Sequence, residues 1–129
     1  MTYYLTKIVP GTYEEAITAV IAALKDEGFG VLTEIDVQAT LKKKLDVDVP
    51  RYMILGACNP QLAHKALQAE NKVGVLLPCN VVVQERTDGS IEVSAMDPAA
   101  AMEAIGNPKL TEIAYDVRSR LNRVLAKLP

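Results

Sequence analysis

Two Cys-Asn pairs are the residues of this sequence best suited to chemistry. Cys58-Asn59 is followed directly by Pro60, and Cys79-Asn80 comes later in the chain. Asn59 can cap a helix that starts at Pro60, and the free N–H groups at such a helix start stabilise a nearby thiolate. Cys58 is therefore the candidate nucleophile. The alternative is that Cys58 is a small apolar residue closing a strand, where structural thiols are inert.

The second pair, Cys79-Asn80, follows Pro78. Because Pro78 has no N–H to donate to a sheet ladder, we expect the chain to kink here or to lie at a sheet edge. Such a kink could turn Cys79 or Asn80 toward a pocket. Alternatively, Cys79 begins a strand and packs with Val81 and Val83.

Two carboxylates, Glu34 and Asp36, are two residues apart in a predicted strand and therefore share a face. Carboxylates placed in this way can act as acid and base or as oxygen ligands. A solvated sheet face also carries such residues without any function. The complete predicted ligand-binding set is Cys58, Asn59, Cys79, Asn80, Glu34 and Asp36.

A metal site is an alternative, because the chain's single His lies in the predicted helix that follows Cys58. Zinc would take Cys58, His64 and Cys79, with Glu70 or water as the fourth ligand. No Cys-x-x-Cys pair anchors such a site, so we predict no metal, and the sequence identifies no cofactor. A redox couple of Cys58 and Cys79 is a further alternative, which requires Cα atoms within about 7 Å of each other.

Capping residues mark where the helices begin. Thr12 and Glu15 form a capping box, in which each side chain serves the backbone N–H of the other. Three further pairs place a capping side chain before a Pro that fits the first helical position: Asn59-Pro60, Asp97-Pro98 and Asn107-Pro108. The predicted helices span residues 13–27, 38–45, 60–69, 98–105 and 108–127.

Apolar and β-branched residues in alternation predict the strands. The predicted strands span residues 2–9, 30–37, 51–58, 75–86 and 90–96. In the second of them, Val31, Thr33, Ile35 and Val37 are expected to form one buried face. The last two form a hairpin around the loop 87–89, because a three-residue loop sets Val83 opposite Val93, and Val81 opposite Ala95, on one apolar face.

These elements predict a single α+β domain over residues 1–129. Their order is strand, helix, four strands and helix, with short extra helices between the strands. Such an order favours an antiparallel-rich sheet with helices packed on one face. The other face is expected to carry Glu34 and Asp36 and to meet water or another subunit.

Charge and composition argue against several partners. The formal net charge is −2, whereas proteins that bind nucleic acid concentrate positive charge. With no Trp and a single Phe, the chain offers few platforms on which bases could stack. No stretch approaches the roughly 18 apolar residues of a membrane span, and the first residues lack a signal-peptide pattern. We therefore expect no nucleic acid, no membrane and a cytoplasmic location.

Four segments resemble the bacterial and archaeal family catalogued as domain of unknown function number 302. These are residues 28–42, residues 55–60, residues 76–81 and the pair Asp97-Pro98. The resemblance extends over nearly the whole chain. It implies a fold similar to that of the TATA-box-binding protein, commonly as a dimer, and it assigns no activity to any residue. A shared fold does not carry the DNA-binding function with it.

Three functions follow as hypotheses. The first is a homodimeric module that binds a small molecule or an ion at Cys58-Asn59 and Cys79-Asn80. The second is a thiol-dependent or redox enzyme that uses Cys58. The third is a structural or interaction subunit, in which the polar sheet face or the long C-terminal helix serves assembly. The sequence alone does not choose between an enzyme and a binding protein.

Overall fold

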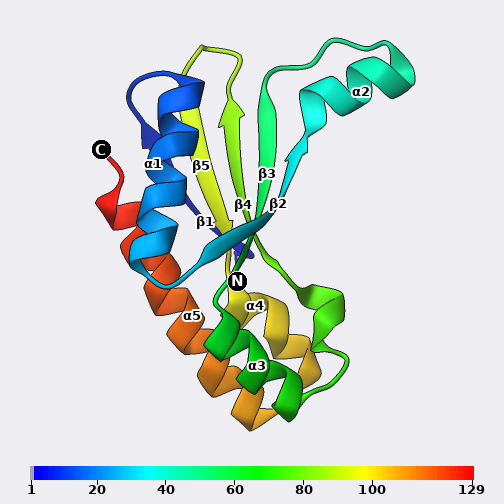
Figure 1. The fold of residues 1–129 in the computed structure, drawn as a ribbon, viewed down its shortest axis with the longest axis vertical. Helices are drawn as coiled ribbons and strands as arrows, with labels where there is room; N and C mark the ends of the chain where they lie inside the picture. Colours follow the sequence, from blue (N-terminus) through cyan, green and yellow to red (C-terminus); the bar gives the residue numbers. More distant parts are fainter. Residues whose placement is uncertain (1) are drawn as a thin grey trace.

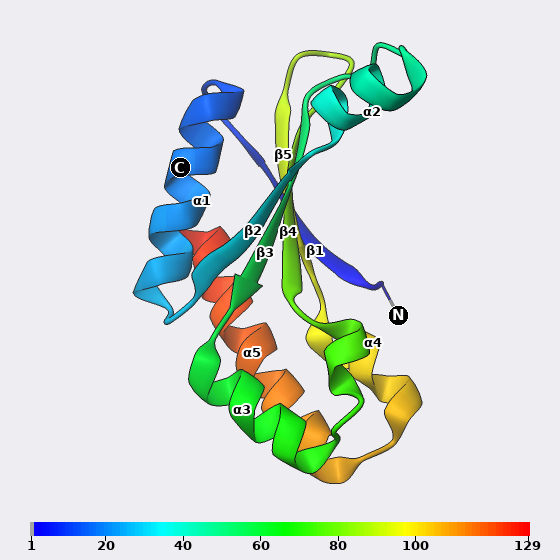
Figure 2. The same ribbon diagram turned by 45° about the vertical axis from the view of Figure 1, so that its right-hand side comes forward.

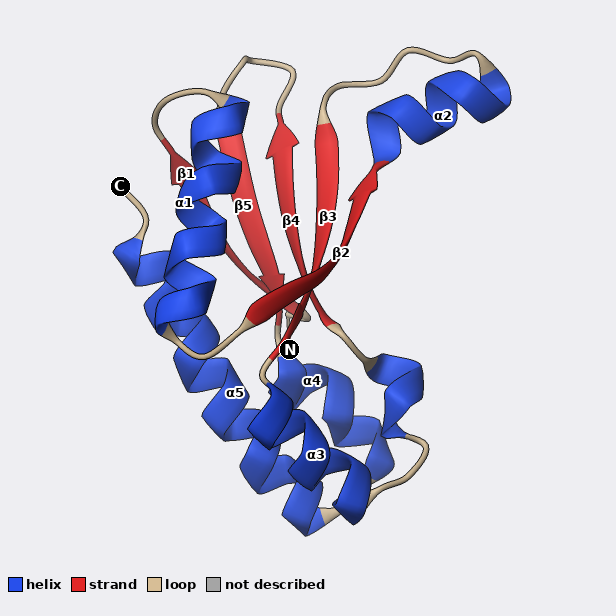
Figure 3. Ribbon diagram, in the orientation of Figure 1, coloured by secondary structure: helices blue, strands red, loops and turns tan. Residues whose placement is uncertain are grey.

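The computed structural model describes residues 2–129, which form a five-stranded sheet and five α-helices (Figure 1; Figure 3). The strands are β1 (Tyr4–Val9), β2 (Gly30–Asp36), β3 (Tyr52–Cys58), β4 (Cys79–Glu85) and β5 (Ile91–Met96). The helices are α1 (Tyr13–Asp26), α2 (Val37–Leu45), α3 (Pro60–Ala69), α4 (Pro98–Met102) and α5 (Pro108–Lys127). Two 3₁₀ turns, η1 and η2, cover Val73–Leu76 and Glu103–Ile105. This content confirms the α+β class.

The helices start where the capping residues predict. The Thr12 hydroxyl accepts the N–H of Glu15 at 3.1 Å, and the Glu15 carboxylate accepts the N–H of Thr12 at 3.0 Å. The predicted helices over 60–69 and 108–127 are confirmed as α3 and α5. The helix predicted over 98–105 is shorter, because the α-helical part ends at Met102 and the chain continues as a 3₁₀ turn.

The sheet has the order β1-β5-β4-β3-β2, and every pair of neighbours is antiparallel. The hairpin register is confirmed, with Val83 opposite Val93 and Val81 opposite Ala95. Gly89 has φ +85°, a left-handed conformation that glycine adopts without strain, which lets the three-residue loop close.

One face of the sheet is covered by α1 and α5, and we call it the covered face (Figure 2). The core lies between these layers and includes the fully buried side chains of Val20, Leu24, Leu55, Val93 and Leu121. Within residues 2–129 the opposite face carries no helix layer, and we call it the open face. Its residues are Tyr4, Thr6, Ile8, Thr33, Ile35, Tyr52, Ile54, Gly56, Asn80, Val82, Gln84, Glu92, Ser94 and Met96.

The side-chain directions predicted for β2 are wrong, because this edge strand contains a bulge. Val31 lies opposite Ala57, yet Thr33 lies opposite Gly56, so Leu32 is an extra residue in the ladder. The bulge leaves Val31 on the covered face and moves Thr33 onto the open face. Beyond it, Ile35 is also on the open face and is 48% exposed, so the strand has no continuous buried side.

The same bulge moves the two acidic residues away from the face on which they were predicted. Glu34 lies opposite the buried Leu55, and Asp36 lies opposite Met53, so both point to the covered side. Both side chains are nevertheless exposed. The Asp36 carboxylate caps α2 by accepting the N–H of Ala39 at 2.9 Å.

Helix α2 stands apart from the helices of the covered face (Figure 1). None of its residues is buried. In the described part of the chain, no helix combines the length and the apolar character needed to cross a bilayer.

Candidate functional site

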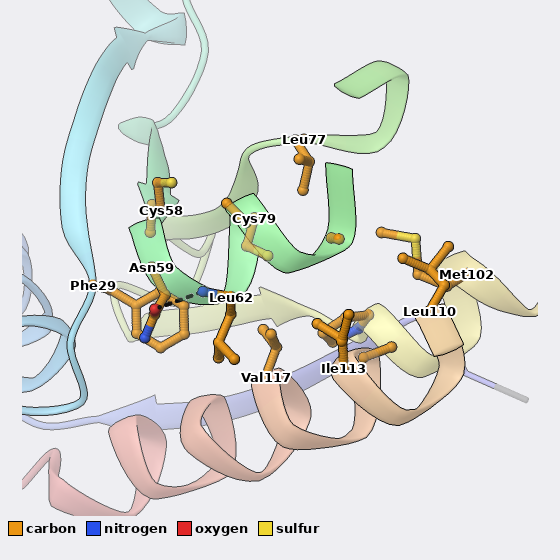
Figure 4. A pocket seen from close by; sticks show the side chains of 15 residues that line it. Phe29, Cys58, Asn59, Leu62, Leu77, Cys79, Met102, Leu110, Ile113 and Val117 are labelled. Atoms are coloured by element: carbon orange, nitrogen blue, oxygen red, sulfur yellow. Dashed lines mark hydrogen bonds between the residues drawn. The ribbon is translucent and has the colours of Figure 1, made fainter. Parts of the chain in front are cut away.

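A cavity lies where the ends of β3 and β4 meet α3, α4 and α5 (Figure 4). It has a volume of about 40 Å³ and sits at the junction of two clusters of buried apolar side chains. The residues that surround it are Phe29, Ala57, Cys58, Asn59, Leu62, Ala63, Ala66, Leu77, Cys79, Pro98, Met102, Leu110, Ile113, Ala114 and Val117. Because this lining is almost entirely apolar, the cavity suits an apolar group and not an ion.

Cys79, the first residue of β4, contributes a buried thiol to this lining. Figure 4 shows its sulfur directed toward the cavity. Burial, and to a lesser extent the neighbouring Cys58, raises the pKa of Cys79 to about 11. At neutral pH the side chain is therefore an uncharged thiol, which serves as a small apolar wall and not as an activated nucleophile.

Cys58 ends β3 beside Cys79, but the two side chains diverge. Ala57 is the residue directly opposite Cys79, so the side chain of Cys58 leaves the strand on the other side. Figure 4 shows the Cys58 sulfur pointing away from the cavity. Both thiols are free, and a disulfide between them would require the backbone to move. The two cysteines are close in the sheet, as predicted, but their side chains point to opposite faces and are not placed to form a redox couple.

The polar atoms of Asn59 are used by the fold. Its Oδ1 caps α3 by accepting the N–H of Leu62 at 3.2 Å, and its Nδ2 donates to the carbonyl of Glu27 at 3.5 Å. The side chain thus joins the start of α3 to the turn between α1 and β2. The cap also satisfies a helix-start N–H that a small anion would otherwise bind.

The same turn is fastened to α5 through Glu27. Arg123 and Lys127 each donate to its carboxylate at 2.8 Å, and Arg120 donates to its carbonyl at 3.2 Å. The hydrogen bonds from Lys127 and then Arg123 lower the pKa of Glu27. These contacts hold Phe29, a cavity-lining residue two positions later, against the core. Sequence patterns did not single out Glu27, because its partners lie about a hundred residues away.

Three of the predicted site residues lie outside the cavity. Asn80 is opposite Gly56 on the open face and is exposed. Glu34 and Asp36 belong to the far part of β2, since Gly30 pairs with Cys58 and Asp36 pairs with Met53. At about 3.3 Å per residue, six residues of strand separate Asp36 from the Cys58 end by roughly 20 Å. The structure therefore brings together Cys58, Asn59 and Cys79 only.

The alternative metal set is not assembled. His64 is exposed on α3, whereas Cys79 is buried below it. Throughout residues 2–129, no three His, Cys, Asp or Glu side chains are close enough together to hold a metal ion. A zinc site of Cys58, His64 and Cys79 would need the helix to rearrange.

The helix residues that line the cavity were not predicted from the sequence. Ala66 of α3 shares one buried cluster with Leu110 and Ala114 of α5, and the two small alanine side chains leave space beside Leu110. The apolar stripes of both helices are visible in the sequence. Which stripes face each other depends on tertiary packing, so the cavity itself could not be located.

A family model and a solved structure identify the same family for this chain. The model of the family described as domain of unknown function DUF302 matches residues 5–128. An uncharacterized protein from Aquifex aeolicus (strain VF5) is 30% identical over 90 residues, which is 70% of this chain and 56% of that protein. The chain thus matches little more than half the length of that relative.

A solved structure shows the same fold. It is the crystal structure of an uncharacterized conserved DUF302 protein from Bacillus stearothermophilus, which is 32% identical and covers 100% of both chains with a TM-score of 0.94. Neither relative has an assigned activity in its description. Because the family model spans nearly all of the sequence, this chain belongs to the DUF302 family.

Proposed function

We propose that this protein is a homodimeric binding module whose ligand places a small apolar group in the cavity between β3, β4 and the helices α3, α4 and α5. One observation carries the proposal: a void of about 40 Å³ lined by apolar side chains. Protein interiors are close-packed, and voids larger than a water molecule are few. The pocket is partly open to solvent, and an apolar pocket of this kind takes up small apolar guests.

The chemistry of the lining supports an apolar ligand over an ionic one. Among residues 2–129, every buried side-chain nitrogen and oxygen already has a hydrogen-bond partner. In this part of the chain no buried polar side chain is therefore left unpaired to bind a polar or charged ligand. The cavity is also smaller than the usual 300–1,000 Å³ or so of a drug-sized site, so it takes a short alkyl group or one end of a longer ligand.

Xenon is a suitable first probe, because it is apolar and small, and it enters dry cavities. We expect xenon to produce saturable shifts in the methyl NMR signals of Met102, Ile113 and Val117, which line the cavity. The methyl signals of Val93, elsewhere in the core, serve as an internal control. Shifts that do not saturate, or that spread equally to Val93, would contradict the proposal.

A pair of variants sharpens this test. Val117→Ile adds one methyl group to the lining and should weaken xenon binding. Val124→Ile makes the same change on the same helix at a buried position away from the cavity, and should leave xenon affinity unchanged. If both variants bind xenon as the wild type does, the void is not the binding site. If Val117→Ile alone weakens xenon binding, a series of alcohols of increasing chain length will define how long an apolar group the cavity admits.

A further inference from the structure

A groove with a volume of about 370 Å³ lies on the open face of the sheet. This volume falls within the roughly 300–1,000 Å³ that is usual for small-molecule sites. The groove shares no lining residue with the apolar cavity, which is on the covered side of the sheet. It is therefore a second candidate site with a chemistry of its own.

Strand register explains why the open face is hollowed at this place. Val82 of β4 lies opposite Ser94 of β5, and both side chains are short. Two residues further along the same strands, the longer side chains of Gln84 and Glu92 lie opposite each other. At the other end, Met96 follows Ser94 on the same face. The short pair thus forms the floor of the groove, between longer side chains at both ends.

The carboxylate of Glu92 is held in place at one end of the groove. This side chain is half-buried, and the Thr6 hydroxyl of β1 donates to its Oε2 at 2.9 Å. From the other neighbouring strand, Nε2 of Gln84 donates to its Oε1 at 3.5 Å. A carboxylate has about four acceptor positions, so these two donors leave room for a ligand. Because Gln84 donates through its nitrogen, its own Oε1 remains an acceptor for a ligand N–H.

The charge of the groove favours a cation. Of the 14 residues of the open face, Glu92 alone is charged. Within residues 2–129 it forms no salt bridge, and no Lys or Arg lines the groove. A partly desolvated carboxylate gains most from a cationic partner, since charge-assisted hydrogen bonds are the strong ones. An anionic ligand would instead be repelled.

The cation that suits this groove is an organic one. A metal ion needs several ligating groups, and in the described chain no three His, Cys, Asp or Glu side chains are grouped to hold one. Three of the five tyrosines line the groove, namely Tyr3, Tyr4 and Tyr52. The face of a tyrosine ring attracts organic ammonium groups. The tyrosines also offer apolar surface to the rest of such a ligand.

The spacing along the strands sets the shape of the ligand. Glu92 and Met96 are four residues apart on β5, which is roughly 13 Å at about 3.3 Å per residue. Met96 lies opposite Tyr4, whose ring packs edge-to-face on Tyr3 with centroids 5.0 Å apart. The groove therefore has a carboxylate at one end and an aromatic wall at the other, with the floor of Val82 and Ser94 between them.

We propose that this groove binds a small organic molecule that carries a primary ammonium group and an apolar or aromatic body. The ammonium group donates to the carboxylate of Glu92 and to Oε1 of Gln84. The body lies over Val82 and points toward Tyr4. This site goes beyond the proposed function and does not depend on it, because it uses none of the residues around the apolar cavity.

A titration of the full chain with 2-phenylethylammonium chloride at neutral pH tests the proposal. We expect saturable shifts of the methyl NMR signals of Val82 and Met96, and unchanged signals from Val117 in the apolar cavity. The neutral compound 2-phenylethanol has the same body without the charge and should bind about tenfold more weakly. Equal affinities for the two compounds, or shifts that do not saturate, would overturn the proposal.

A pair of charge variants tests the role of Glu92. Glu92→Gln keeps an acceptor for the Thr6 hydroxyl but removes the charge, and should weaken binding of 2-phenylethylammonium about tenfold while leaving that of 2-phenylethanol unchanged. Glu34→Gln makes the same change at an exposed strand carboxylate on the covered side and should have no effect. Equal losses in both variants would mean that the cation responds only to the net charge of the protein.

A second pair of variants tests the floor of the groove without touching its charge. Val82→Phe fills the space above the floor and should weaken binding at least about tenfold. Ile35→Phe adds a similar ring to the same face outside the groove, at a side chain that is 48% exposed, and should leave the affinity unchanged. Wild-type affinity in Val82→Phe would place the ligand elsewhere and refute the assignment. Xenon should still enter the apolar cavity in Glu92→Gln and in Val82→Phe, so failure of the groove and failure of the cavity give different results.

Discussion

Filling the cavity with one methyl group should stabilise the protein. Val117 on α5 is 8% exposed and borders the void of about 40 Å³. At about 24 cal/mol for each Å³, an empty cavity of that size costs at most about 1 kcal/mol of unfolding free energy. Burying one additional methylene contributes about 0.8 kcal/mol by transfer from water. The two values agree, so Val117→Ile should raise the unfolding free energy by about 0.5–1 kcal/mol.

The matched control separates the cavity from a general effect of isoleucine. Val124 lies on the same helix, is fully buried and does not border the void. Val and Ile have similar helix propensities, so packing alone distinguishes the two sites. Val124→Ile forces a methyl group into filled space and should cost about 1–3 kcal/mol.

Urea unfolding followed by circular dichroism measures both values at one temperature. The variants should differ by at least about 1.5 kcal/mol, with Val117→Ile above the wild type and Val124→Ile below it. In thermal unfolding, each 1 kcal/mol corresponds to a midpoint shift of about 3–6 °C for a chain of this size. Equal destabilisation by the two substitutions would refute the reasoning, because it would mean that the space beside Val117 is already occupied.

Three further substitutions have outcomes that follow from the structure. Burial raises the pKa of Cys79 to about 11 in the folded state, whereas the thiol of the unfolded chain ionises near its ordinary pKa of 9.0. This thiol therefore leaves the unfolding free energy unchanged well below pH 9 and lowers it by roughly 2 kcal/mol as pH rises from 9 toward 11. Cys79→Val should remove that fall in urea titrations. Asp97→Ala should lower the unfolding free energy by about 2 kcal/mol, because Asp97 is buried, caps α4 and accepts a hydrogen bond from Arg118 at 3.0 Å. Asp97→Asn keeps a capping oxygen and should cost about half as much. Gly56→Ala should destabilise strongly, because its Cβ would overlap the Thr33 hydroxyl and lie 2.9 Å from Pro78, and Thr33→Ala should recover part of the loss.

Each of these outcomes has a clear contrary result. Parallel pH profiles for the wild type and Cys79→Val would show that this thiol is not the group that titrates. Equal losses in the two Asp97 variants would place the whole effect in the ion pair and none in the cap. A double variant no better than Gly56→Ala alone would mean that Pro78, and not Thr33, sets the limit.

The parts of the fold that depend on neighbouring residues could be predicted from the sequence. Asn59 and Asn107 each cap the helix that begins at the next residue, so these starts are visible as Asn-Pro pairs. The hairpin register was likewise available, because the loop is short and only one register brings Val81 and Val83 onto an apolar face. In both cases the interacting atoms lie a few residues apart or are linked by a single tight turn.

The bulge in β2 could not be predicted, because its cause is in another strand. Gly56 has no side chain, and the Thr33 hydroxyl occupies the space that a Cβ there would need. An alternating pattern read along β2 alone contains no signal for an extra residue at Leu32. One inserted residue then reversed the faces expected for Thr33, Ile35, Glu34 and Asp36.

The site shows why residue type alone was a poor guide to its chemistry. The two Cys-Asn pairs do meet at one end of the sheet, but Asn59 is consumed by capping and Asn80 faces the other side. Cys79 lines a void whose other walls come largely from α3, α4 and α5. Since buried polar atoms in residues 2–129 are already paired, a ligand can gain free energy there only by filling apolar space. Asn59 therefore helps to position the residues that line the cavity, and the shape of the cavity determines which apolar group can bind.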